Sequence, residues 1–259
     1  MSRTDRDGAF FRGEGISLRF GGVTALQDVA FAVEPGQLQA IIGPNGAGKT
    51  SLFNVITGLY PLDAGEILLD GARLTGAPTH VVARHGIVRT FQNLEIFANM
   101  TVLENVLTGE HLHGRYGALD ALLRTRRFAR EERRLRQQAE DALRFVGLQD
   151  VLGQPAGHLP FGSQRLLEIA RALGAAPRIL LLDEPAAGLN VKETEALGGL
   201  IRRIVDRGVT VLMVEHDMSL VMGISDRVLV LNYGEVIASG TPAAVQQNPA
   251  VIAAYLGEE

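Results

Sequence analysis

The amino-acid sequence predicts an α/β fold in which a mostly parallel sheet is covered on both faces. Short runs that are apolar at nearly every position recur at 38–42, 178–182, 210–214 and 227–231. Such runs are typical of strands buried on both sides. Helical patterns, such as Val191 to Asp206, lie between the later runs. Strands that alternate with helices favour parallel pairing, because a crossover helix returns the chain to the same end of the sheet.

Two segments differ from this pattern and resemble hairpins. Residues 15–37 and 65–75 show alternating apolar and polar positions with turn signals such as Gly21-Gly22 and Asp70-Gly71. Alternation with glycine-containing turns is typical of antiparallel strands. The sequence therefore predicts a small antiparallel sheet beside the parallel one.

A third segment, residues 93–165, contains no strong strand pattern and much helical sequence. We expect one domain over 1–259, in which 14–92 and 166–259 form the sheets and 93–165 form an inserted helical subdomain. The charged run from Arg126 to Arg136 is most simply a solvated helix face with ion pairs four residues apart.

Composition limits the possible functions. The 259 residues are 46% hydrophobic and 21% charged, with a net charge of −4 and no cysteine. The acidic balance gives no support for nucleic-acid binding, and the absence of cysteine excludes disulfides and thiol chemistry. The sequence has no run long enough to span a membrane and no signal-peptide pattern at its start, so we expect a protein that reaches a membrane only through a partner.

A complete phosphate-binding motif follows the first core strand. Residues 43–50 match G-x-x-x-x-G-K-[ST], and a helical pattern follows directly. Glycines let backbone N–H groups surround a phosphate, and the helix start adds a positive dipole end. The lysine reaches the terminal phosphates and the threonine hydroxyl can bind Mg²⁺. The predicted nucleotide contacts are Gly43, Pro44, Asn45, Gly46, Ala47, Gly48, Lys49, Thr50 and the adjacent Ser51.

Two carboxylates end the apolar run at 179–182. Asp183 and Glu184 come next, and ligands bind at this edge of an open α/β sheet. Asp183 is suited to hold Mg²⁺, and Glu184 is suited to polarise the water that attacks the γ-phosphate. The simpler alternative is a strand end followed by acidic turn residues.

Histidine follows another apolar run. His216 comes two residues after the run at 210–214, where it could contact the γ-phosphate, although a single histidine at a strand end is more often a surface or packing residue. His111 and His113 have no partners at metal-ligand spacing and are expected in a loop.

With these three elements in this order, the chain resembles the ATP-binding subunits of ATP-binding cassette (ABC) transporters over nearly its whole length. The resemblance implies a P-loop NTPase core of the RecA-like type. It places Gln92 as the Q-loop glutamine and Mg²⁺ ligand, 187–190 as the D-loop, and Phe20 where an aromatic ring stacks on adenine. It also implies that His216 is the switch histidine and that Glu184 is the catalytic carboxylate.

The resemblance further implies a sandwich in which two cassettes enclose two ATP molecules. Each ATP lies between the P-loop of one subunit and the signature sequence of the other. At the position of the signature sequence this chain has HLPFGSQR, residues 158–165, with Pro160 instead of the usual serine. Gly162 and Ser163 keep their N–H groups at a helix start, so we expect a clamp that acts through backbone and dipole, with unequal sites in a heterodimer.

A narrower likeness is carried by VRTFQN, LDEPAAGLN, VEHDMSLVMGISDRVLVLNYG and NPAVIAAYLGEE. These strings are similar to ATPase subunits of bacterial branched-chain amino acid importers. The implied partners are a second ATPase subunit, two membrane-spanning permeases and, indirectly, a periplasmic solute-binding protein, at the cytoplasmic face of the inner membrane. Related ATPases for urea, amides or lipopolysaccharide, and a regulatory cassette with little turnover, are the alternatives. Few residues follow NYGEVIASGTP, so we expect no regulatory domain that binds solute.

Overall fold

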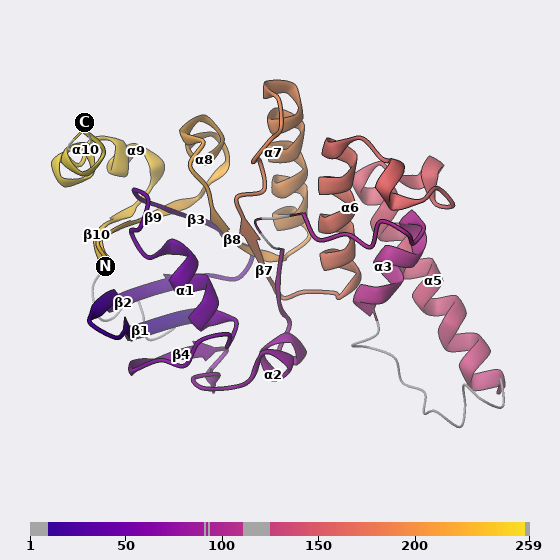
Figure 1. Cartoon of the computed structure of the whole chain (residues 1–259), viewed down its shortest axis with the longest axis horizontal. Coiled ribbons are helices and arrows are strands. Elements are labelled where there is room, and N and C mark those ends of the chain that lie inside the picture. Colours follow the sequence, from indigo (N-terminus) through magenta and orange to yellow (C-terminus); the bar gives the residue numbers. More distant parts are fainter. Residues whose placement is uncertain (1–9, 91, 93, 111–124, 257–259) are drawn as a thin grey trace. The chain divides into compact units, whose positions relative to one another are not determined.

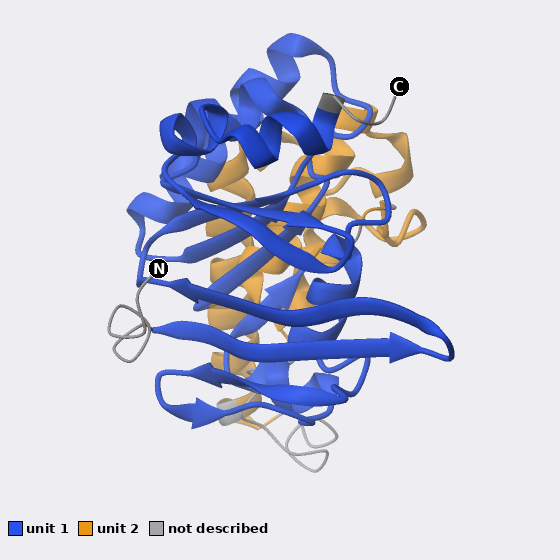
Figure 2. Ribbon diagram, turned by 90° about the vertical axis from the view of Figure 1, so that its left-hand side faces the viewer, with its two compact units in different colours: residues 1–89, 178–259 blue, residues 90–177 orange. Residues whose placement is uncertain are grey.

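A computed structural model describes residues 10–90, 92, 94–110 and 125–256. The chain divides into two compact units, one formed by residues 1–89 and 178–259 and the other by residues 90–177, shown in Figure 2. His111 and His113, expected in a loop, lie outside the described residues, as do Phe91 and Asn93 of VRTFQN and the last residues of the chain.

The larger unit is built on a six-stranded sheet in the order β10-β9-β3-β8-β7-β6, part of which is visible in Figure 1. All pairings are parallel except that of β10 with β9. Every residue of β3, β7 and β8 is buried, as expected for strands covered on both faces. The strands are β3 (Leu38–Ile42), β6 (Ile87–Arg89), β7 (Ile179–Asp183), β8 (Thr210–Val214), β9 (Arg227–Asn232) and β10 (Glu235–Gly240).

A second sheet in the same unit is antiparallel and has the order β2-β1-β4-β5. Its buried residues share one hydrophobic cluster with the parallel sheet and α1, including Phe11, Phe31 and Phe53. The strands are β1 (Phe11–Phe20), β2 (Val23–Val33), β4 (Ala64–Leu69) and β5 (Ala72–Arg73). The predicted α/β class with a parallel and an antiparallel sheet is therefore confirmed.

Helices complete this unit. In α7 the start is fixed by a capping box, since the Asn190 side chain accepts the Glu193 N–H while the Glu193 carboxylate accepts the Asn190 N–H. The helices are α1 (Lys49–Ile56), α2 (Thr79–Arg84), α7 (Val191–Asp206), α8 (Met218–Ile224), α9 (Pro242–Gln246) and α10 (Pro249–Leu256).

The smaller unit is helical where it is described. Helices α3 (Val102–Glu110), α5 (Arg126–Val146) and α6 (Phe161–Gly174) pack on one another, with short 3₁₀ turns at Gln149–Val151 and Ala156–His158. On α5, Arg134 pairs with Glu131 and Arg136 pairs with Glu140 at exposed positions. Most of the described charged residues in this run are exposed, in agreement with a solvated helix face, although the Arg134–Glu131 pair is three residues apart rather than four.

The sequence pattern did not predict β6. This strand has only three residues and pairs with β7 through Ile87, Val88 and Arg89. A run this short carries no measurable periodicity, so its place depends on the neighbouring strand. No helix among the described residues is both long enough and apolar enough to cross a bilayer.

Glu110 at the end of α3 leads to a prediction on pH and stability. Its side chain is 1% exposed, and within the described part of the chain neither carboxylate oxygen has a hydrogen-bond partner. Burial raises the pKa of this carboxyl from 4.5 to about 7, against the opposing charge of Arg134. The unfolded chain therefore releases this proton at lower pH than the folded chain, which lowers stability as pH rises between these two values.

We expect Glu110→Gln to remove this part of the pH dependence, because the amide does not titrate. Urea unfolding followed by circular dichroism between pH 4.5 and 7 measures it. The exposed substitution Asp150→Asn serves as a control that keeps the wild-type slope. An unchanged slope in Glu110→Gln contradicts the prediction.

Candidate active site

The loop between β3 and α1 has two positions whose backbone conformation and close neighbours require glycine. Gly43 and Gly48 have φ of 152° and 101°. A Cβ atom at Gly43 would lie 2.1 Å from the Leu231 carbonyl oxygen, and one at Gly48 would lie 2.6 Å from the Ala25 carbonyl oxygen. The glycines of the motif are thus required by close backbone packing as well as by the left-handed conformation.

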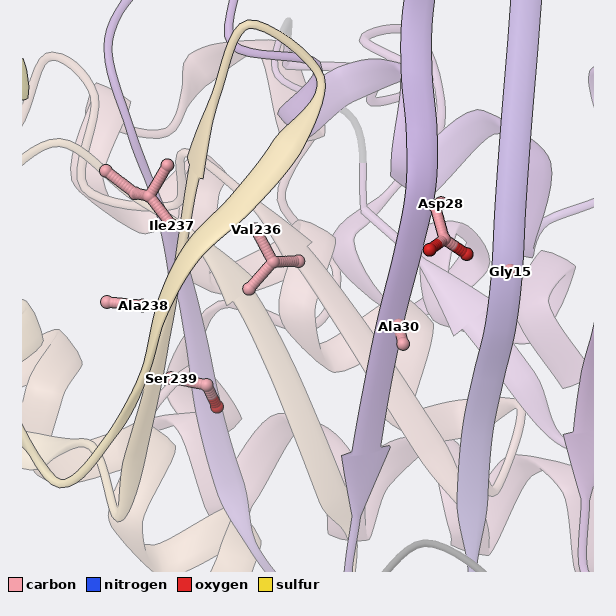
Figure 3. Close-up of a pocket in the computed structure, with 7 residues that line it drawn as sticks. All are labelled: Gly15, Asp28, Ala30, Val236, Ile237, Ala238 and Ser239. Carbon is pink, nitrogen blue, oxygen red and sulfur yellow. The ribbon is translucent and has the colours of Figure 1, made fainter. Parts of the chain in front are cut away.

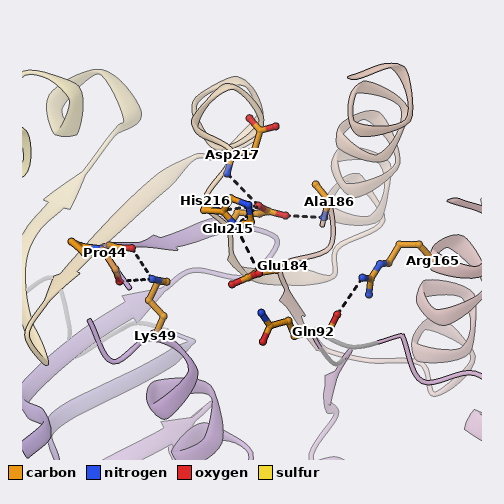
Figure 4. Close-up of polar contacts among 10 residues, drawn as sticks. Pro44, Lys49, Gln92, Arg165, Glu184, Ala186, Glu215, His216 and Asp217 are labelled. Atoms are coloured by element: carbon orange, nitrogen blue, oxygen red, sulfur yellow. Dashed lines mark hydrogen bonds and ion pairs between the residues drawn. The ribbon is translucent and has the colours of Figure 1, made fainter. Parts of the chain in front are cut away.

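Lys49 is the first residue of α1 and turns back over the loop. Its Nζ donates to the carbonyl oxygens of Gly43 at 2.6 Å and Pro44 at 2.7 Å (Figure 4). The ammonium is therefore held above the loop, where a phosphate would lie against the helix start. Thr50 and Ser51 follow in the first turn of α1, where the first N–H groups of a helix have no intrahelical acceptor.

The two predicted carboxylates lie at the end of β7. Asp183 is the last residue of the strand and is 2% exposed. Glu184 follows with φ of 46°, an uncommon conformation for a residue with a side chain, and its N–H donates to the Val214 carbonyl oxygen at 2.9 Å. The strand ends just before this left-handed residue. Backbone strain of this kind is typical of functional sites.

Arg89, at the end of β6, forms an ion pair that the sequence did not reveal. Its Nη2 lies 2.6 Å from Asp183 Oδ2, and its Nη1 donates to Asn54 Oδ1 at 2.7 Å. The guanidinium also lies 5.5 Å from the centre of the Phe53 ring. These three contacts connect β6, β7 and α1 around the predicted metal ligand.

His216 follows β8 and lies beside Glu184. Its Nδ1 is 3.7 Å from Glu184 Oε2, and its side chain is 67% exposed (Figure 4). The imidazole is thus exposed at the same end of the sheet as the catalytic candidate. A ligand could therefore reach both groups.

Glu215 is a second residue that the sequence did not single out. Its buried carboxylate accepts N–H groups from Ala186 at 2.7 Å, His216 at 3.0 Å and Asp217 at 3.3 Å. It therefore joins the turn after Glu184 to the turn that carries His216, as Figure 4 shows. No motif signal marks this glutamate, because its role depends on backbone donors from two separate loops.

Phe20, the predicted adenine contact, ends β1 and is 47% exposed. Its ring meets Tyr60 edge to face, with centroids 5.2 Å apart. An exposed aromatic ring at the end of β1 is compatible with stacking on a base.

The remaining predicted site residues belong to the smaller unit and are described within it. The Gln92 carbonyl oxygen accepts Arg165 Nη2 at 3.3 Å (Figure 4). Pro160 is the N-cap of α6, with extended φ and ψ of −55° and 151°, so the helix begins at Phe161 rather than at the proline. Gly162 and Ser163 lie in the first turn, where backbone N–H groups have no intrahelical acceptor.

One cavity of the larger unit lies apart from these residues. It has a volume of about 400 Å³ and lies between β10 and the β1–β2 pair (Figure 3). Among the described residues, Asp28 is the one charged residue that lines it, and none of the described site residues does so. The cavity therefore gives no alternative to the site at the sheet edge.

A family model for ABC transporters matches residues 26–187, and a model for branched-chain amino acid ATP-binding cassette transporters matches residues 235–259. The chain belongs to the ABC transporter family, as one of its ATP-binding cassettes. It is 49% identical to the high-affinity branched-chain amino acid transport ATP-binding protein BraF of Pseudomonas aeruginosa, across 94% of this chain and 96% of that protein. It is 46% identical to LivG of Escherichia coli with the same coverage.

Solved structures agree with this assignment. A nucleotide-free ATP-binding cassette from an ABC transporter superposes with a TM-score of 0.84 and 34% identity, covering 96% of this chain and 99% of that one. An ADP-bound cassette gives the same TM-score and identity. The predicted family and fold class are therefore confirmed.

Glu215→Ala tests whether the buried carboxylate joins the two turns. Three N–H groups lose their acceptor, and each buried unsatisfied group costs about 1–3 kcal/mol. We expect a clear fall in the free energy of unfolding, measured by urea titration, and faster hydrogen exchange at Ala186 and His216. The exposed Glu235→Ala is the matched control. Equal stability of the two variants would refute the assignment.

Proposed function

We propose that this chain is the ATP-hydrolysing subunit of a bacterial ABC importer for branched-chain amino acids. One observation supports the proposal above all. In the larger unit, Lys49 belongs to a complete phosphate-binding motif, and Asp183, Glu184 and His216 lie at the carboxyl ends of β7 and β8. The identity to BraF and LivG, whose names give branched-chain amino acid transport, supports the choice of solute.

The proposed ligands are ATP and Mg²⁺, and the donor set fits this metal. The described residues contain no cluster of three or more His, Cys, Asp or Glu that would form a protein cage for a metal. Mg²⁺ is typically bound by one or two protein oxygens together with phosphate oxygens and water. The Asp183 carboxylate, the Thr50 hydroxyl and the Gln92 amide oxygen are hard oxygen donors of this kind. When bound, Mg²⁺ neutralises charge on the β- and γ-phosphates.

In the proposed reaction the chain's own residues bind the triphosphate and direct water to it. The loop N–H groups and Lys49 hold the phosphates, and Phe20 stacks on the adenine. Glu184 accepts a proton from the attacking water, and His216, 3.7 Å from that carboxylate, is positioned to stabilise the γ-phosphate. Glu215 fixes both turns through the three backbone N–H bonds described above.

The proposed partners are a second ATPase subunit, two membrane-spanning permease subunits and, through these, a periplasmic solute-binding protein. Docking to the permeases would place the chain at the cytoplasmic face of the inner membrane. This part of the proposal depends on the resemblance to importer subunits and on the names of the relatives.

The altered signature supports a heterodimer with unequal sites. In the family's sandwich, Pro160, Gly162 and Ser163 would face the ATP bound by the partner. Pro160 has no hydroxyl, so the clamp would consist of the N–H groups and dipole at the start of α6. The site built on Lys49 and Glu184 would instead depend on the signature of the partner.

Glu184→Gln tests the catalytic assignment. A general base typically contributes about 10²–10⁴-fold to the rate, so we expect turnover to fall by at least about 100-fold while ATP still binds. ATP hydrolysis in the assembled membrane complex measures this, with the exposed Glu235→Gln as the control. Unchanged turnover in Glu184→Gln would refute the catalytic role. A wild-type complex that binds ATP without turning it over would favour a regulatory cassette.

Pro160→Ser tests the clamp. The added hydroxyl should strengthen ATP-dependent dimerisation of the Glu184→Gln protein, by roughly tenfold for a hydrogen bond to a charged group. Serine also caps α6 better than proline does, so Pro160→Asp is needed as a control, because it caps equally well but repels phosphate. Sedimentation with and without ATP measures the effect. Equal behaviour of the two variants would contradict a clamp at this position.

A further inference from the structure

We propose that Arg89 is a positioning residue for the predicted Mg²⁺ ligand. It holds the Asp183 carboxylate in place, and its positive charge lowers the affinity of the site for the metal. This inference rests on the proposed function, since it concerns the same nucleotide site. Arg89 is the second residue of the VRTFQN string, but it belongs neither to the phosphate loop nor to the acidic pair, and the sequence pattern predicts no role for it.

The guanidinium of Arg89 contacts two different elements of the larger unit. The two terminal nitrogens of Arg89 are divided between two acceptors, Asp183 Oδ2 at 2.6 Å and Asn54 Oδ1 at 2.7 Å. Asn54 lies on α1, the helix that begins with Lys49, so the guanidinium connects the metal ligand to the helix that follows the phosphate loop. A lysine could not form this fork, because its single ammonium cannot match two acceptors in one plane.

Arg89 and Asp183 are both buried, with side chains 9% and 3% exposed. A carboxylate buried to this degree is costly without a compensating partner, and the guanidinium 2.6 Å away is such a partner. The guanidinium carbon of Arg89 also lies 5.5 Å from the centre of the Phe53 ring. These contacts hold the Asp183 carboxylate in one orientation.

The positive charge of Arg89 acts against a cation at Asp183. The guanidinium contacts Oδ2 of this carboxylate at 2.6 Å, so it repels a cation that approaches either carboxylate oxygen. The metal must therefore bind less tightly than it would to an uncompensated carboxylate.

The position of Arg89 in the chain adds a consequence. Arg89 pairs with Leu181 across the β6–β7 ladder and is the last residue of the larger unit before the chain enters the smaller one at Thr90. The metal ligand is thus tied to the point where the chain leaves the nucleotide-binding unit.

The test compares the affinity of the purified chain for a fluorescent ADP analogue in Mg²⁺ and in EDTA. The ratio of the two affinities isolates the contribution of the metal from general effects of a substitution. In Arg89→Met we expect this ratio to rise at least about threefold, because a repelling charge is removed. The exposed Arg73→Met, whose partner Glu66 lies 4.0 Å away, should leave the ratio unchanged.

Further variants separate charge from structure. Arg89→Lys keeps the charge, so the ratio should stay near the wild-type value although the fork is lost. Arg89→Gln is also uncharged and should raise the ratio as well. Because its side chain is polar, it provides the measurement if Arg89→Met fails to fold. Adding Asp183→Asn to Arg89→Met should abolish the increase, because the affected ligand is removed.

A ratio that is unchanged or lower in both Arg89→Met and Arg89→Gln would overturn the inference. Failure of the proposed function gives a different result, since the wild-type chain would then bind the ADP analogue equally in Mg²⁺ and EDTA, or not at all. An increase in the two uncharged variants, absent from Arg89→Lys and Arg73→Met, supports Arg89 as the residue that tunes the metal site.

Discussion

The parallel pairing of β7 with β6 on one side and β8 on the other places the polar groups of the site at one edge of the sheet. All five residues of β7 are buried, and the four apolar side chains that precede Asp183 leave the strand little freedom to shift its register. The carboxyl ends of the three strands then present Arg89, Asp183 and Glu215 together, although these residues are far apart in the sequence. The chemistry of the site is therefore a consequence of strand order and register.

Two buried carboxylates at this edge are stabilised in different ways. Asp183 has a guanidinium partner, whereas Glu215 accepts backbone N–H groups from two turns. Both arrangements fix a side chain or a turn before a ligand arrives, and such preorganisation is the main source of electrostatic catalysis. The left-handed backbone at Glu184 belongs to the same region, since strain of this kind persists only where surrounding contacts hold it.

Much of this architecture was predictable from the sequence. The buried strands, the loop of Gly43–Thr50 and the carboxylates of Asp183 and Glu184 all leave local patterns, because each is set by neighbouring residues. The strand β6, the Arg89–Asp183 pair and the role of Glu215 leave none. Each depends on partners brought together by the fold, such as a hydrogen bond between residues 94 positions apart. The helix start near Gly162 and Ser163 was expected from the sequence, whereas the N-cap position of Pro160, with its extended conformation, comes from the structure.

The central claim is that one nucleotide is held jointly by the phosphate loop and the carboxyl ends of β7 and β8. A structure of the Glu184→Gln protein with ATP and Mg²⁺ tests it most directly. We expect the triphosphate to lie against the loop and Lys49, and Mg²⁺ to lie between the Thr50 hydroxyl and the Asp183 carboxylate. Nucleotide bound away from Lys49, or metal with no direct or water-bridged contact to Asp183, would contradict it.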